Sequence, residues 1–104
     1  MLLTTTDTIP GKEITEILGI ARGSTIRARN LGRDFLAAMK NIVGGEIKEY
    51  TKLMADSREE AMTRMVKDAG KLGADAIINI RFTTSMVMSA TSEILAYGTA
   101  VKIK

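Results

Sequence analysis

The sequence contains no histidine, no cysteine and no tryptophan among its 104 residues. Histidine and cysteine are the side chains that most often titrate near neutral pH, act as nucleophiles or bind soft metals. Their absence excludes disulfides, thiolate catalysis and metal clusters built on cysteine or histidine. A chain without cysteine is also consistent with a reducing compartment, and we expect the protein to be cytoplasmic.

Aromatic residues and long apolar runs are scarce as well. Aromatics make up 4% of the chain, which leaves few surfaces on which single-stranded bases could stack. The net charge of +3 is too mild to indicate nucleic acid unless the positive charge is clustered. No run reaches the roughly 18 apolar residues of a membrane helix, and residues 1–7 lack the basic and apolar parts of a signal peptide. We expect no nucleic-acid partner and no membrane span.

Residues 1–104 are expected to form one α+β domain, because a chain of this size buries enough surface for a single core. The first half contains β-prone and turn-forming residues. Gly19 or Gly23 is expected to bend the long β-rich stretch or to form a bulge in it. The predicted elements are a short β-prone segment at 2–6, a turn at 8–11, one or two strands within 12–29 and a short helix at 33–42.

A long helix is the strongest periodic signal. Apolar residues recur at intervals of three and four between Glu46 and Leu72, which predicts about seven helical turns. Gly73 follows where a left-handed residue commonly ends a helix. Opposite charges at helical spacing add to the pattern. The predicted apolar stripe is Ile47, Tyr50, Leu53, Met54, Ala61, Met62, Met65, Val66, Ala69 and Leu72, and the charge pairs are Glu60 with Arg64 and Arg64 with Asp68.

Two strands are predicted at 74–84 and 93–104, joined by a linker at 85–92, and both strands are apolar on both faces. We expect a two-layer subunit in which a small antiparallel or mixed sheet packs on one long and one short helix. Two helices cannot cover both faces of such a sheet, so another copy of the chain is expected to cover the rest. The residues assigned to the uncovered faces are Ile77, Ile94, Ala96, Gly98 and Ala100.

Four segments, at 17–29, 43–51, 58–61 and 93–101, together resemble the YbjQ family, and the resemblance runs nearly end to end in the family's order. It implies an antiparallel sheet packed on a long helix, a fold similar to dodecin-like flavin-binding subunits, and assembly as a homopentamer. The family is uncharacterised and is labelled a heavy-metal-binding domain. One departure is that residues 86–92 lack the glycines that family members often have before the last strand. The resemblance supplies no catalytic residues.

The metal label leaves thioethers, carboxylates and carbonyls as ligands. Met86 and Met88 are two apart and would face the same way on an extended segment, where a symmetric ring could offer their sulfurs to Cu(I). The alternative is that they fill an apolar subunit contact. Carboxylate sites would need convergence of side chains that the pattern does not bring together, and a structural role is the better interpretation for them. These carboxylates are Glu13, Glu16, Glu46, Glu49 and Glu93.

A basic run surrounds Gly23-Ser24-Thr25 and could bind phosphate or another anion if several copies converge on a symmetry axis. The pattern lacks the glycine spacing of a P-loop, and solvated edge charges are the simpler explanation. Asn79 and Arg81 could pair with Glu93 or line a cavity, and a hydrogen-bonded structural role is the simpler interpretation for both. The candidate anion-binding residues are Ser24, Arg27, Arg29 and Arg33, with Arg22 in the same run.

Three functions remain open. The first is a ring-forming, non-enzymatic homo-oligomer that binds a metal ion or small anion. The second is a structural or regulatory scaffold that recruits another protein. An enzyme is the least favoured, although Tyr50, Tyr97, lysines, serines and carboxylates are present. The sequence identifies no cofactor and no specific small ligand.

Overall fold

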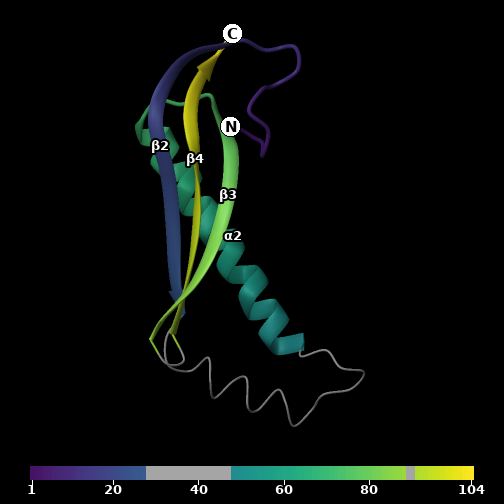
Figure 1. The fold of residues 1–104 in the computed structure, drawn as a ribbon, viewed down its shortest axis with the longest axis vertical. Helices are drawn as coiled ribbons and strands as arrows, with labels where there is room; N and C mark the ends of the chain where they lie inside the picture. The colour runs from purple at the N-terminus through teal and green to yellow at the C-terminus, as the bar shows by residue number, and fades with distance from the viewer. Residues whose placement is uncertain (28–47, 89–90) are drawn as a thin grey trace.

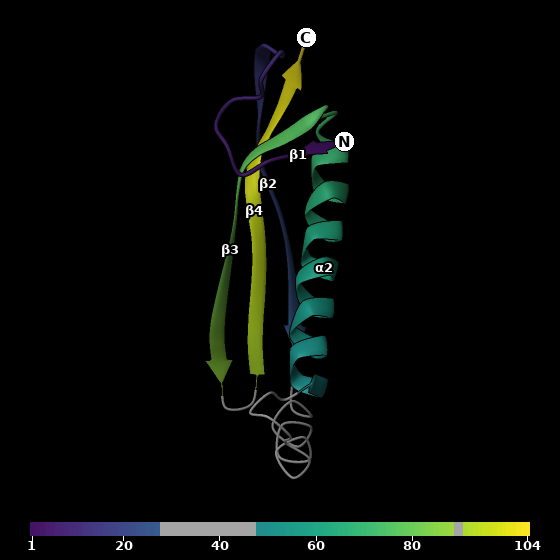
Figure 2. The same ribbon diagram turned by 90° about the vertical axis from the view of Figure 1, so that its right-hand side faces the viewer.

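The structure is a computed structural model that describes residues 1–27, 48–88 and 91–104. In these ranges a mixed four-stranded sheet has the order β1-β3-β4-β2, with β1 parallel to β3 and the other pairs antiparallel. Helix α2 lies along one face of the sheet (Figure 1, Figure 2). The predicted short helix at 33–42 lies outside the described residues. The elements are β1 (Leu2–Leu3), β2 (Ile14–Arg27), α2 (Lys48–Lys71), β3 (Ala76–Met88) and β4 (Thr91–Ile103).

The long β-rich stretch forms the single strand β2, and its predicted bulge lies at Gly19. The register with β4 shifts between Ile17 and Gly19, so Leu18 is an extra residue, and Gly19 has a φ of 137°. Only glycine readily adopts such a backbone conformation. Gly23 has a different role, because it lies against the backbone of α2. The bulge places Ile17 and Ile20 on the same face of the sheet.

Strand β3 also contains a bulge, which the sequence pattern did not predict. Ile78 pairs with Thr99 and Arg81 with Tyr97, so β3 has one more residue than β4 between these rungs, and Asn79 has a φ of 55°. An extra residue exchanges the two faces of the strand. Ile77 and Ile80 therefore both belong to the core beneath α2.

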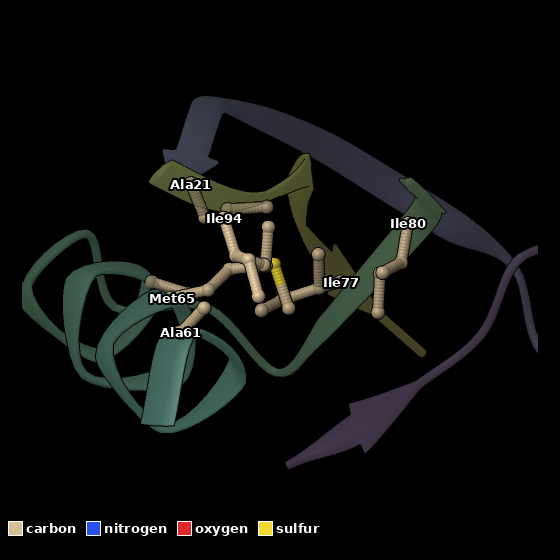
Figure 3. Packing of buried hydrophobic residues seen from close by; sticks show 9 residues of the cluster. Ala21, Ala61, Met65, Ile77, Ile80 and Ile94 are labelled. Atoms are coloured by element: carbon tan, nitrogen blue, oxygen red, sulfur yellow. The ribbon is translucent and has the colours of Figure 1, made fainter. Parts of the chain in front are cut away.

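The main core lies between α2 and the sheet (Figure 3). Ala61, Met65 and Ala69 of α2 are buried, as the predicted stripe requires, whereas Leu72 at the end of the stripe is exposed. Gly73 has a φ of 78°, and the N–H of Ala74 donates to the carbonyl of Ala69, which is the expected glycine-terminated helix end. The sheet contributes Ala21, Ile77, Ile80, Ile94, Ala96 and Ala100.

The predicted linker at 85–92 is wrong at both ends. Strand β3 continues to Met88 and β4 begins at Thr91, with Met86 paired to Ser92 and Met88 to Thr91. Threonine, serine and β-branched valine fit a pleated strand, and pairing with a neighbouring strand outweighs their loop-like polarity. No helix among the described residues has the length and apolarity needed to cross a membrane.

Candidate functional site

The face of the sheet opposite α2 carries strongly exposed apolar side chains. Three isoleucines of β2 are more than half exposed, namely Ile17 (71%), Ile20 (68%) and Ile26 (58%). The register places them on the side of Thr99 and Glu93, away from the α2-facing Ala96 and Ala100. We call this surface the open face. Its described residues are Ile17, Ile20, Arg22, Ser24 and Ile26 of β2, Glu93, Leu95, Tyr97 and Thr99 of β4, and Arg81, Thr83 and Ser85 of β3.

The face that the sequence pattern assigned to a partner is the wrong one. Ile77, Ile94, Ala96 and Ala100 pack beneath α2, and a β-carbon on Gly98 would meet Ile77 and Ile80 there. The alternating pattern identifies two sets of side chains but does not show which set meets the helix. Among the described residues, the face that no helix covers is instead the open face.

The N-terminal segment covers one end of the open face (Figure 2). Ile9 is buried against Ala76, Ile78 and Val101 in a second, smaller core. The predicted turn at 8–11 holds it there, because the N–H of Lys12 donates to the carbonyl of Ile9 and Gly11 has a φ of 77°. The remainder of the open face has no cover from the described residues.

A polar row crosses the middle of the open face. Tyr97 of β4 is the register partner of both Arg22 of β2 and Arg81 of β3. Side chains of register partners lie on the same face. Nη1 of Arg81 donates to the carbonyls of Thr5 (3.0 Å) and Ile80 (2.8 Å), so the N-terminal segment holds this guanidinium at the sheet surface. We call these three residues the Arg-Tyr-Arg row.

The predicted anion site is only partly within the described residues. Ser24 is half-buried on the open face, two residues from Arg22 along β2. Arg29, Arg33 and the side chain of Arg27 lie outside the described residues. Because Tyr97 and Arg81 come from other strands, the run of arginines in β2 could not reveal that they lie beside Arg22.

Arg81 and Asn79 are hydrogen-bonded to backbone carbonyls, as the structural interpretation expects, and neither is the register partner of Glu93. Glu93 pairs in register with Ile26 and Ser85, whereas Arg81 pairs with Tyr97, four residues away along β4. At about 3.3 Å per residue this separation is roughly 13 Å along the strand, and no ion pair joins the two residues in the described ranges. Asn79 takes its place in the β3 bulge, where its N–H donates to the carbonyl of Thr6.

The candidate metal ligands form no cluster within the part of the chain that the structure describes. Met86 is 75% exposed on β3, and the side chain of Met88 lies outside the described residues. No group of three or more acidic side chains capable of holding a metal ion occurs in the described ranges. Glu16 is the register partner of Lys102, and the backbone of Glu13 is hydrogen-bonded to that of Lys104. Both glutamates are therefore part of the pairing between β2 and the C-terminal end of the chain. Glu46 and the side chain of Glu49 lie outside the described residues.

Two polar features of the helix–sheet contact escaped the sequence analysis. Thr25 Oγ1 donates to the carbonyl of Ser57 at 3.1 Å, and both residues are buried. At the outer edge of β2, Asp68 accepts the N–H of Arg22 at 3.0 Å, and Arg64 donates to the carbonyl of Ser24 at 2.6 Å. Side chains of α2 thereby form hydrogen bonds with backbone groups at the outer edge of β2. The predicted Glu60–Arg64 ion pair is present.

The sequences of similar proteins match this chain over nearly its full length. A UPF0145 protein of Methanosarcina acetivorans is 60% identical over 103 residues, covering 99% of this chain and 97% of the relative. One from Archaeoglobus fulgidus is 56% identical, covering 100% and 96%. Among solved structures, a protein of unknown function from Pediococcus pentosaceus, of the DUF74 family, is similar with a TM-score of 0.67. That match is 19% identical and covers 100% of this chain and 98% of the other, so it supports the fold alone.

The family profile described as "Putative heavy-metal-binding" matches residues 1–104. The sequence lacks the thiolates and imidazoles that most often hold heavy metals, so methionine thioethers are its remaining soft ligands, and the described acidic side chains form no cluster. The match over the full length and the identities of 60% and 56% nevertheless agree on one assignment. The chain belongs to the uncharacterised YbjQ family, whose relatives are named UPF0145 proteins.

Proposed function

We propose that the protein is a non-enzymatic binding module whose copies close into a ring, with a neighbouring copy covering the open face. The exposure of Ile17, Ile20 and Ile26 on that face carries the proposal. Complete burial of an exposed isoleucine side chain contributes about 1.5–3 kcal/mol. Because these three are about two thirds exposed, covering them favours association by roughly 3–6 kcal/mol before its entropic cost. The homopentamer implied by the resemblance is the ring that we expect.

A second apolar surface supports a ring over a two-fold dimer. Phe82 (42% exposed) and Met86 lie on the α2 side of β3, where the helix, which lies over β2 and β4, leaves the sheet uncovered. This surface and the open face are different patches on opposite sides of the sheet. Contacts between two unlike patches are head to tail, and they generate rings when the rotation closes.

The outer surface of α2 is a poor match for the open face. Its exposed residues include Asp56, Arg58, Glu59 and Lys67, which would lose hydration against isoleucine side chains. The Phe82–Met86 surface is therefore the better counterpart for the open face of the next copy.

Analytical ultracentrifugation of the wild type, Ile20→Lys and Thr63→Lys tests the ring. Ile20→Lys places a charge on the open face, and Thr63→Lys places the same charge on the exposed surface of α2. We expect the wild type and Thr63→Lys to form one large species, and Ile20→Lys to sediment as a folded monomer. A wild-type particle of about 11.3 kDa at low micromolar concentration would overturn the proposal, as would unchanged assembly of Ile20→Lys.

The scaffold alternative has one observation in its favour. The N–H of Ile80 donates to the carbonyl of Thr4, and after Ile80 no strand among the described residues pairs with the outer edge of β3. Residues 82–88 contain no charged residue, proline or glycine that would protect this edge from pairing. Proteins normally protect such an edge, and an extended peptide of a partner could pair with it. Thr84→Pro would then abolish binding of a copurifying partner while leaving the ring intact, whereas a ring lost in Thr84→Pro would assign the edge to self-assembly.

A further inference from the structure

We propose that the Arg-Tyr-Arg row on the open face binds a small tetrahedral oxyanion of the phosphate type. Arg22, Tyr97 and Arg81 come from three adjacent strands and share one rung of the sheet. Neighbouring strands are about 4.8 Å apart, so the two arginine backbones lie roughly 10 Å apart with the tyrosine between them. Two guanidinium groups at this spacing can both reach one ion held above Tyr97.

The arginines of the row form no ion pair among the described residues. Asp7, two residues after the Thr5 carbonyl that binds Arg81, is exposed and does not pair with Arg81. Neither Arg22 nor Arg81 has a carboxylate partner among the described residues. The carboxylate on the described open face is Glu93, about 13 Å along β4 from Tyr97, and this exceeds the Debye length of about 8 Å at physiological ionic strength. Asp68 approaches Arg22 only at its backbone N–H, on the outer edge of the strand. An anion is therefore the counter-charge that the row lacks.

Arg81 is held at the side of the row that is next to the N-terminal segment. Its Nη1 is held by the carbonyls of Thr5 and Ile80, which fixes the plane of the guanidinium. Arginine has five N–H donors, so further donors remain for an oxyanion. Ser24 lies beside Arg22 and Thr83 beside Arg81 along their strands, and each adds a hydroxyl on the same face. Donors from both sides suit a tetrahedral ion with several oxygens.

Assembly would strengthen the binding. In the proposed ring the open face is covered, and burial of two unpaired arginines is unfavourable unless an opposite charge accompanies them. This coupling rests on the proposed function, whereas the binding site itself does not. We therefore expect inorganic phosphate both to bind to the full chain and to stabilise the assembled form.

Isothermal titration calorimetry with inorganic phosphate tests the site in the wild type, Arg22→Gln and Arg58→Gln. Arg22→Gln is the informative variant, because no hydrogen bond or ion pair to its guanidinium occurs among the described residues and the fold should not depend on it. Arg58→Gln removes the same charge from the exposed surface of α2. We expect Arg22→Gln to weaken binding at least tenfold and Arg58→Gln to leave it unchanged. Tyr97→Phe should weaken binding less than Arg22→Gln, since the arginines remain.

Absence of phosphate binding to the wild type would overturn the proposal. Equal losses in Arg22→Gln and Arg58→Gln would also overturn it, because they would indicate only nonspecific charge. Loss in Arg27→Gln/Arg29→Gln but not in Arg22→Gln would place the site elsewhere and would likewise be a refutation. Sedimentation of the same samples separates the two proposals: a monomer that binds phosphate removes the ring alone, and a ring that does not bind it removes the anion site alone.

Discussion

Gly23 of β2 lies directly against the backbone of α2 at Ala61. A β-carbon at position 23 would overlap the carbonyl oxygen of Ala61 and the backbone nitrogen of Met65, and it would come within 2.7 Å of the carbonyl carbon of Arg64. These atoms belong to the helix backbone and cannot rotate away. The glycine therefore sets how closely the helix approaches the sheet, and the apolar contacts of Ala61 and Met65 depend on that approach.

Gly23→Ala should consequently destabilise the protein by about 3 kcal/mol, at the upper end of the usual cost of overpacking. Urea denaturation measures the change. Gly70→Ala is the matched control, because a β-carbon there would have no atom within 4 Å and alanine favours the helix by about 1 kcal/mol. Similar unfolding midpoints for the two variants would contradict the close contact.

Thr25→Val should cost about 1 kcal/mol of stability, because it removes the buried hydrogen bond from Thr25 Oγ1 to the carbonyl of Ser57 while keeping the side-chain shape. Thermal or urea unfolding gives the difference. Thr15→Val serves as the comparison, since Thr15 is exposed and its bond to the Lys102 carbonyl is 3.4 Å long. We expect that variant to lie within about 0.5 kcal/mol of the wild type. An equal effect at both positions would show that the buried bond contributes nothing specific.

Asn79→Ala should destabilise the β3 bulge by about 1 kcal/mol, because alanine is strained at a φ of 55° and asparagine tolerates it better. Asn79→Gly removes that strain, so we expect it to be more stable than Asn79→Ala. Differential scanning calorimetry of the pair provides the measurement. Equal stability of Asn79→Ala and Asn79→Gly would show that the positive φ of the bulge does not determine which residue is favoured at position 79.

Asp68→Ala should expose the outer edge of β2. The carboxylate accepts the N–H of Arg22, and a charged acceptor makes such a bond stronger than a neutral one. We expect faster hydrogen exchange of the Arg22 amide and a stability loss of about 1–2 kcal/mol. Asp68→Asn keeps an acceptor oxygen and should retain much of the protection. Unchanged exchange in Asp68→Ala would mean that another group protects this amide.

Much of the local structure could be predicted from residue order. The helix follows from apolar spacing near 3.6 residues, and its end follows from Gly73, whose φ of 78° suits glycine. The turn at 8–11 follows from Pro10 and Gly11, and the bulge at Gly19 from a glycine inside a β-rich stretch. These features depend on a few neighbouring residues.

The absence of histidine and cysteine is known from the composition without any structure, and it limits the metal chemistry open to the chain.

The candidate site could not be predicted in the same way. Its row joins residues 22, 81 and 97, and only strand register brings them to one rung. The bulge at Asn79 exchanges the faces of β3, so period-two counting from Ala76 assigns Ile80 to the wrong side. Ser57 is buried although its polarity suggests a solvent-facing position, since α2 approaches β2 closely there.

Local sequence therefore specified the long helix with its glycine end, the turn at 8–11 and the chemistry that is missing, because backbone preferences and apolar periodicity act over a few residues. Tertiary packing decided which face of the sheet α2 covers and which isoleucines stay exposed. It also decided which arginines are register partners of Tyr97. Both faces of the strands are apolar enough to form a core. The choice between them depended on where a helix backbone could approach, and Gly23 provided that place on only one face.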